Sequence, residues 1–130
     1  GMFDADPWRA YLIGLSEGKV NQDFMTVFWK GVGANWLVCL GMYMGYAGRD
    51  IIGKVIGIWI PVMLFVVFGY EHSVANMFFI PAAIYSGADI TWYSFIIDNL
   101  IPATIGNFVG GVLLVGTVYW YLYLRKSILI

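Results

Sequence analysis

Long apolar runs make up most of the chain, and charged residues interrupt them at only a few places. The four longest stretches without Lys, Arg, Asp or Glu are residues 31–48, 55–70, 72–88 and 99–124. A helix needs about 20 apolar residues to cross the roughly 30 Å hydrocarbon core of a membrane. The last stretch is long enough by itself. The first is long enough once residues 24–29 are added, which places Lys30 inside the membrane.

The two middle stretches are short, because each forms only about 24–26 Å of helix. They allow two interpretations. Residues 51–70 and 74–88 are either two full spans, which gives four crossings, or two halves of one broken span, which gives three. In the second interpretation the halves meet near Glu71 and His72.

The basic residues separate the two interpretations, since lysine and arginine gather on the cytoplasmic side of a membrane. With three crossings, four basic residues share one side of the membrane: Arg49, Lys54, Arg125 and Lys126. The opposite loop, residues 87–93, contains neither lysine nor arginine. With four crossings, the two basic pairs lie on opposite sides. We therefore favour three crossings, with the middle one broken and the C-terminus in the cytoplasm.

This pattern predicts an all-α membrane protein whose transmembrane repeat covers residues 23–126. We expect spans at residues 24–47, at 51–70 with 74–88 as the broken element, and at 99–124. Residues 1–22 contain several charges and Pro7, so we expect an extramembrane loop or a short interfacial segment there. They lack the charged region and apolar run of a signal peptide.

Composition agrees with this class and excludes others. The chain is 61% hydrophobic and 12% charged, with a mean hydropathy of +0.78. A formal net charge of −1 provides no positive field for phosphate, so we expect no nucleic-acid partner. Cys39 and His72, each single in the chain, cannot form a structural zinc site. Phosphate-loop, dinucleotide, nucleophile-elbow and paired-carboxylate motifs are absent, so we expect no metal, no cofactor and no enzymatic activity.

Glycine and aromatic residues also fit helices in a membrane. Two glycine pairs have the GxxxG spacing that lets helices approach closely, Gly41 with Gly45 and Gly106 with Gly110. Aromatic residues gather near the expected span ends, as in a membrane-interface belt: Trp92, Tyr93, Tyr119, Trp120, Tyr121 and Tyr123.

Polar side chains at membrane depth are the functional candidates, because each is unfavourable there unless it faces a cavity or a partner. Lys30 either extends to the nearby interface or is an intramembrane cation paired with a carboxylate. Glu71 is the acidic residue near the middle of the broken element, so we predict a Lys30–Glu71 pair. Asn35 and Asn107 lie in the flanking spans, where they either form interhelical hydrogen bonds or contribute to a site.

His72 and Ser73 lie at the predicted break. Broken helices occur in membranes where the unwound backbone lines a cavity, and a helix N-terminus there is electropositive and suits a small anion. A histidine, with a reference pKa near 6.5, can change charge at physiological pH. These features favour a functional histidine over a structural one.

Three segments of the chain resemble the formate/nitrite transporter family. Gly69-Tyr-Glu-His-Ser-Val-Ala-Asn-Met-Phe78 is similar to the family signature. Lys30-Gly31 with Asn35-Trp-Leu-Val-Cys39 resembles its fourth helix, and Asn99 to Gly111 with Tyr119-Trp-Tyr121 resembles its sixth. The resemblance covers roughly residues 12–124.

The resemblance implies an aquaporin-like fold of two inverted three-helix repeats, of which this chain matches the second. Family members are pentamers with one pore per protomer, and they pass small monovalent anions such as formate, nitrite or hydrosulfide. We therefore expect an integral protein of a prokaryotic cytoplasmic membrane. We also expect a homopentamer of complete protomers, which requires the first repeat.

The same resemblance assigns roles to individual residues. It makes His72 the central pore histidine and Asn35 the asparagine beside it. Lys30, Glu71 and Asn107 become a buried polar cluster near a vestibule. Phe65 is similar to an outer constriction residue, and Val38 to an inner one.

Several functions stay open from sequence alone. The expected one is a channel or transporter for weak-acid anions, formate before others, with proton coupling through His72. The chain is then a fragment of a transporter, half of a split transporter, or a truncated product. The alternative is a membrane anchor or non-transporting half-subunit, with His72 as an axial haem ligand or a structural residue. Haem b in a membrane bundle usually takes two histidines, and this chain has one.

Overall fold

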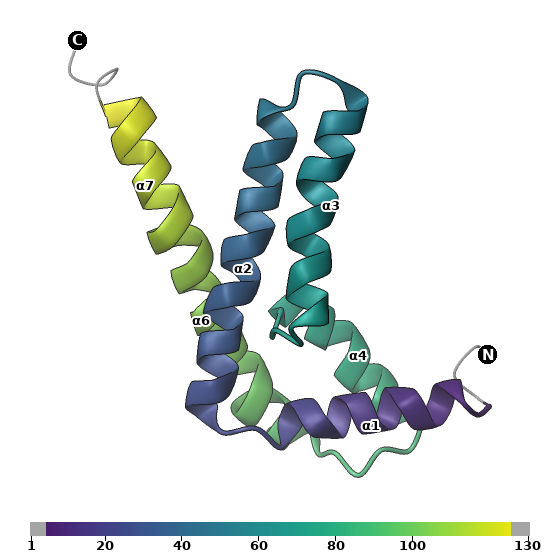
Figure 1. Ribbon diagram of the computed structural model, residues 1–130. Helices are drawn as coiled ribbons and strands as arrows, with labels where there is room; N and C mark the ends of the chain where they lie inside the picture. The colour runs from purple at the N-terminus through teal and green to yellow at the C-terminus, as the bar shows by residue number, and fades with distance from the viewer. Residues whose placement is uncertain (1–4, 126–130) are drawn as a thin grey trace.

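The computed structural model describes residues 5–125. These residues form helices and no strands (Figure 1): α1 (Trp8–Val20), α2 (Phe24–Ala47), α3 (Ile51–Val67), α4 (Ser73–Tyr85) and one continuous helix from Trp92 to Leu124. The continuous helix alternates α-helical and π-helical segments: α5 (Trp92–Ser94), η1 (Phe95–Leu100), α6 (Ile101–Phe108), η2 (Val109–Gly116), α7 (Thr117–Tyr119) and η3 (Trp120–Leu124). The predicted all-α class is confirmed.

Aspartate side chains fix where the first two long helices begin. The Asp23 carboxylate accepts a hydrogen bond from the Thr26 N–H at 3.0 Å at the start of α2. The Asp50 carboxylate accepts from the Gly53 N–H at 2.8 Å at the start of α3. These bonds satisfy backbone donors that the first turn of a helix leaves free.

Helix α2 is the centre of the fold, because it packs along both α3 and α6. Figure 1 shows α2 and α3 side by side and antiparallel, with α6 passing behind α2 at an angle and α7 diverging from it. The crossing depends on glycine. A Cβ atom added to Gly106 would meet the Phe28 carbonyl, and one added to Gly110 would meet the Val32 carbonyl, both well inside van der Waals contact. The GxxxG pair of the last helix therefore lets the two backbones touch.

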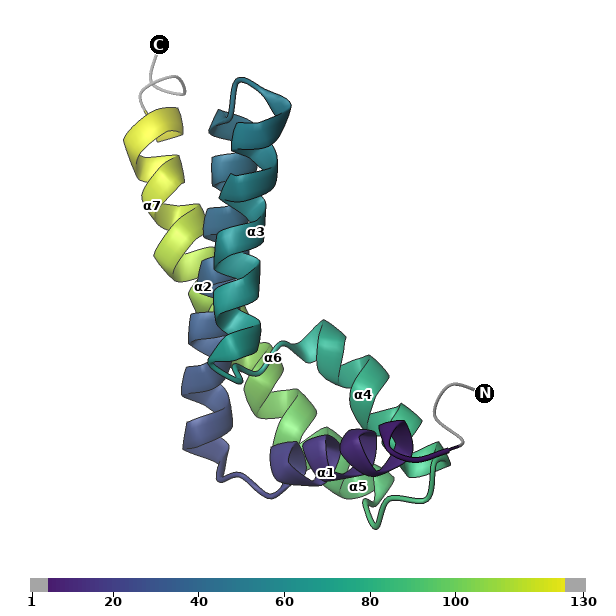
Figure 2. The ribbon, with the colours of Figure 1, turned by 45° about the vertical axis from the view of Figure 1, so that its right-hand side comes forward.

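The middle element is broken between α3 and α4, as predicted. Helix α3 ends in a Schellman motif, in which Gly69 adopts a left-handed φ of 61°. The Gly69 N–H donates to the Val66 carbonyl, and the Tyr70 N–H donates to the Phe65 carbonyl, each at 3.0 Å. The chain then turns, and α4 leaves at a steep angle to α3 (Figure 2).

Residues 8–20 form a helix, where the sequence predicted a loop or a short interfacial segment. Helix α1 lies across the ends of the long helices and against α4 (Figures 1 and 2). Its buried residues Leu12, Ser16 and Val20 recur every fourth position, which is one helical face. The Ser16 hydroxyl donates to the Phe79 carbonyl at 3.1 Å, so this face is fixed to α4.

Length and composition also mark the membrane-spanning part. Among the helices of residues 5–125, Trp92–Leu124 is long and apolar enough to cross a membrane by itself, with a mean hydropathy of 1.7 over its most apolar window. Helices α3 and α4 are apolar but shorter than a full span. The outward faces carry large exposed apolar side chains such as Ile51, Trp59 and Val67, which suits contact with lipid or with other helices.

Candidate functional site

Glu71 is the centre of a buried polar network at the break between α3 and α4. Its side chain is 1% exposed. The Lys19 Nζ lies 3.0 Å from Glu71 Oε2, and the Gln22 Nε2 donates to Oε1 at 3.0 Å. The Asn76 and Asn99 amides donate to Oε2 at 2.7 and 3.3 Å. Each of these partners is a donor, which is the pattern that an ionised carboxylate requires.

The predicted direct pairing of Lys30 with Glu71 is wrong. Lys19 forms the ion pair instead, and the Lys30 Nζ donates to Gln22 Oε1 at 2.5 Å. The reason is that α1 folds against α4, which brings the end of α1 to the break. Lys30 belongs to the network indirectly, because the Gln22 amide lies between the Lys30 ammonium and the Glu71 carboxylate.

Sequence reasoning missed Lys19 and Gln22 because residues 1–22 were placed outside the membrane. The four-residue spacing of Leu12, Ser16 and Val20 is the signal that could have identified α1 as a packed helix.

Asn107 joins the break to α2 and α6. Its Nδ2 donates to the Gly31 and Glu71 carbonyls, both at 2.9 Å. Its Oδ1 accepts from the backbone N–H and the hydroxyl of Ser73, again at 2.9 Å each. The Asn35 Nδ2 donates to the Asn107 carbonyl at 2.8 Å, so this predicted site residue forms an interhelical hydrogen bond. The network therefore holds the unwound backbone in one conformation.

The amide of Asn76 extends the network into α4. Its Nδ2 also donates to Asn99 Oδ1 at 2.8 Å, so two acceptors fix the orientation of the amide. Asn76 Oδ1 is then buried without a hydrogen-bond partner among residues 5–125.

His72 lies at the start of α4, next to Glu71 in the chain, and its ring is half-buried. Its side chain caps no backbone N–H of the helix. The ring packs against Phe65, with 5.7 Å between the ring centroids. A pocket of about 220 Å³ brings His72, Phe65, Lys19 and Asn76 together between α1, the end of α3 and the start of α4.

The structure therefore places the Lys19 ammonium, the His72 imidazole, the Asn76 amide and the Phe65 ring around one pocket. Val38, also predicted for the site, is half-buried on α2 and is not among the residues that line the pocket. Within residues 5–125, no three His, Cys, Asp or Glu side chains are grouped so that they could hold a metal ion.

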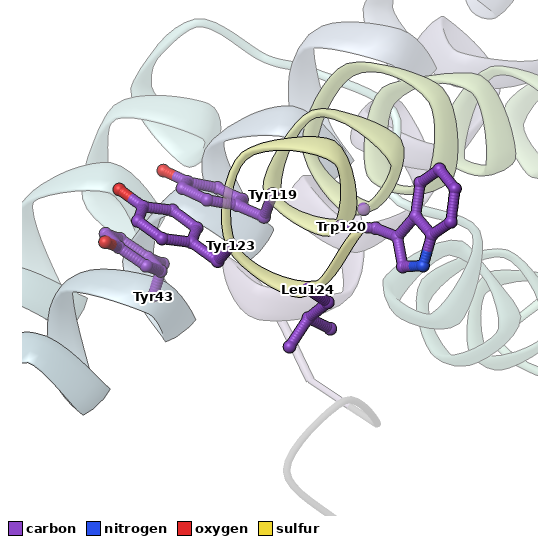
Figure 3. A pocket seen from close by; sticks show the side chains of 6 residues that line it. Tyr43, Tyr119, Trp120, Tyr123 and Leu124 are labelled. Carbon is purple, nitrogen blue, oxygen red and sulfur yellow. The ribbon is translucent and has the colours of Figure 1, made fainter. Parts of the chain in front are cut away.

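A second groove, of about 380 Å³, lies between α2 and the end of the last helix (Figure 3). Tyr43 stacks on Tyr119 with 4.3 Å between the ring centroids, and Tyr119 stacks on Tyr123 with 5.8 Å. Figure 3 shows the three phenol rings side by side, with Trp120 on the opposite side of the helix. Aromatic and apolar side chains line this groove, and no charged side chain is among them.

Comparison with known proteins places these features in a family. A sequence model of formate/nitrite transporters matches residues 1–121. The chain is 46% identical to a probable formate transporter of Methanothermobacter thermautotrophicus, over 97% of this chain and 51% of that protein. It is 38% identical to the formate channel FocA of Escherichia coli K12, over 92% of this chain and 48% of that protein.

Solved structures agree with the sequence comparison. A pentameric formate channel with formate bound superposes with a TM-score of 0.82 and 36% identity, covering 95% of this chain and 56% of that chain. These relatives are named as channels and transporters rather than enzymes. The chain spans about half the length of the curated relatives it matches. On this evidence the chain belongs to the formate/nitrite transporter family.

Proposed function

We propose that this chain supplies one repeat of a membrane channel or transporter for small monovalent weak-acid anions, with formate as the first substrate. The observation that carries this is the pocket where Lys19, paired with buried Glu71, meets His72 at the start of α4. Relatives named as formate channels support the choice of formate over nitrite and hydrosulfide.

Two features of the chain attract an anion to the pocket. Lys19 and Lys30 together exceed the Glu71 carboxylate by one positive charge, and the first turn of α4 adds the partial positive charge of a helix N-terminus. Phe65 opposes passage, because an apolar ring at a constriction disfavours a bare charge that has lost its water.

In the proposed mechanism, His72 allows an anion that the pocket attracts to pass the apolar Phe65 ring. It donates a hydrogen bond or a proton to the anion beside Phe65, so that the species that passes is neutral or nearly so. The proton returns to the ring from water after the acid has left. This role uses a side chain that caps no helix backbone and whose ring lies in the pocket wall.

The complete pore requires a second wall. We propose that five protomers assemble, each containing the other repeat, in the cytoplasmic membrane of a prokaryote with the C-terminus in the cytoplasm. The alternative is a fragment, anchor or half-subunit that transports nothing.

The first experiment is a flux measurement on the native complex that contains this chain, reconstituted in vesicles after its mass is determined in mild detergent. We expect a large assembly and saturable entry of formate, with nitrite and hydrosulfide as comparison anions. Absence of formate flux from an assembled complex would overturn the proposal. A Soret absorption band in the same sample would favour the haem-anchor alternative.

A further inference from the structure

The Gln22 side chain joins the Lys30 ammonium to the Glu71 carboxylate, although it lies in the connection between α1 and α2. Its Nε2 donates to Glu71 Oε1 at 3.0 Å and to the Lys19 carbonyl at 3.3 Å. Its Oε1 accepts from Lys30 Nζ at 2.5 Å. The side chain is half-buried, so these bonds are partly shielded from water.

These contacts fix the orientation of the Gln22 amide. A lysine ammonium only donates hydrogen bonds, and an ionised carboxylate only accepts them. If the amide turned over, its NH₂ would face the Lys30 ammonium and its oxygen would face the Glu71 carboxylate. Both contacts would be repulsive, so Gln22 presents a fixed dipole between Lys30 and Glu71.

The charge of the network depends on Gln22 being neutral. Lys19 and Lys30 contribute +2 and Glu71 contributes −1, which leaves +1 beside the pocket of His72. A carboxylate at position 22 would bring the sum to zero. Two further acids, Asp23 and Asp98, line an opening of about 460 Å³ together with Gln22. Their carboxylates accept hydrogen bonds from Thr26 and Ser94.

We propose that Gln22 is a positioning residue for anion binding, which couples Lys30 to the Glu71–Lys19 pair as a neutral bridge and keeps the network positive. This inference rests on the proposed function, because it assumes that an anion enters the pocket. It assigns Lys30 a role through Gln22 rather than through direct contact with Glu71.

The decisive variant is Gln22→Glu, which keeps the size of the side chain and changes its charge. In formate flux measurements on the native complex in vesicles, we expect the KM for formate to rise about five- to tenfold relative to wild type near neutral pH. Two carboxyl groups within hydrogen-bonding distance favour sharing one proton. The ratio of variant to wild-type KM should therefore fall toward one as the pH is lowered, with little change in maximal rate.

The lysine variants test the same coupling without adding an acid. Lys30→Met should raise KM by a similar factor, and Lys30→Arg should restore most of it. If Lys30 acts through Gln22, the double variant Lys30→Met with Gln22→Ala should differ from the worse single variant by less than about twofold. Lys54→Met is the matched control, because Lys54 is an exposed lysine in the first turn of α3.

The outcomes separate this inference from the proposed function. A wild-type complex without formate flux overturns both. Wild-type flux with an unchanged KM in Gln22→Glu at every pH overturns only the role of Gln22. If Gln22→Glu fails to assemble, the lysine variants decide. An equal KM in Lys30→Met and Lys54→Met then overturns the inference, and a rise in Lys30→Met alone that Lys30→Arg reverses supports it.

Discussion

The Lys19 ammonium lies 3.0 Å from the Glu71 carboxylate, although 52 residues separate the two in the chain. The Lys19 side chain is 12% exposed and that of Glu71 is 1% exposed, so water screens the pair weakly. The contact ties α1, which lies across the ends of the long helices, to the break between α3 and α4. This ion pair thus links the end of α1 to the carboxylate that precedes His72 in the chain.

Removing the cation of this pair should destabilise the fold. Lys19→Met leaves Glu71 buried with only amide donors, and an uncompensated buried charge destabilises a protein by about 3 kcal/mol. We expect the unfolding midpoint of the complex in detergent to fall accordingly in denaturant titrations.

The double variant Lys19→Met with Glu71→Gln is the internal control for this prediction. It removes the buried charge together with its partner, so it should recover part of the lost stability. A Lys19→Met complex as stable as wild type would contradict the central position of the pair.

The His72 ring should affect transport more than folding. His72→Ala removes a ring that contacts Phe65 and caps no helix, so we expect the complex to assemble normally. Formate flux should lose its wild-type dependence on pH, because the group that exchanges a proton with the anion is gone. The measurement is flux in vesicles over a range of pH, and flux equal to wild type at every pH would rule out the role.

Much of the architecture is readable from the spacing of charges. Glu71 interrupts an apolar region too short for two spans, and the left-handed Gly69 stands two residues before it, where the helix ends. The break was predicted from the two short uncharged stretches and from the basic residues, which share one side of the membrane when the middle span is broken. The two GxxxG pairs also indicated close helix contact, and Gly106 and Gly110 provide it against α2.

The partners within the site were harder to predict, because they depend on how α1 folds back. Hydropathy selects residues at membrane depth, so it selected Lys30 and passed over Lys19, which stands among polar residues. The contact of α1 with α4 carries Lys19 to the break. The spacing of Leu12, Ser16 and Val20 indicates a buried face on α1 but does not identify α4 as its partner. Gln22 is neutral and lies in a short connection, so neither charge nor hydropathy marks it.

Ionised Asp23 should stabilise the folded protein, and this stabilisation should be lost at acid pH. Hydrogen bonds from the hydroxyl and the backbone N–H of Thr26 lower the pKa of the Asp23 carboxyl from its ordinary value of 3.8. A carboxyl with a lowered pKa in the folded state stabilises the fold above its ordinary pKa. The benefit is lost as the pH falls through the lowered value.

The variant Asp23→Asn can still accept from Thr26 but does not ionise. We expect the stability difference between wild type and this variant to shrink between about pH 6 and pH 3. Unfolding midpoints at matched pH check this, and a difference that stays constant would show that ionised Asp23 does not support the start of α2.

The contact between α2 and α6 should tolerate no side chain at Gly106. In Gly106→Ala, the new Cβ would meet the Phe28 carbonyl and the backbone of Val32, neither of which can move like the end of a flexible side chain. Overpacking of this kind destabilises by about 1–3 kcal/mol. Gly14→Ala is the matched control, because an added Cβ there has no atom within 4 Å and α1 gains a better helix former. Denaturant titrations of the two variants should therefore move in opposite directions from wild type. Equal midpoints would mean that the two helices can separate without loss, and that the glycine pair does not set their distance.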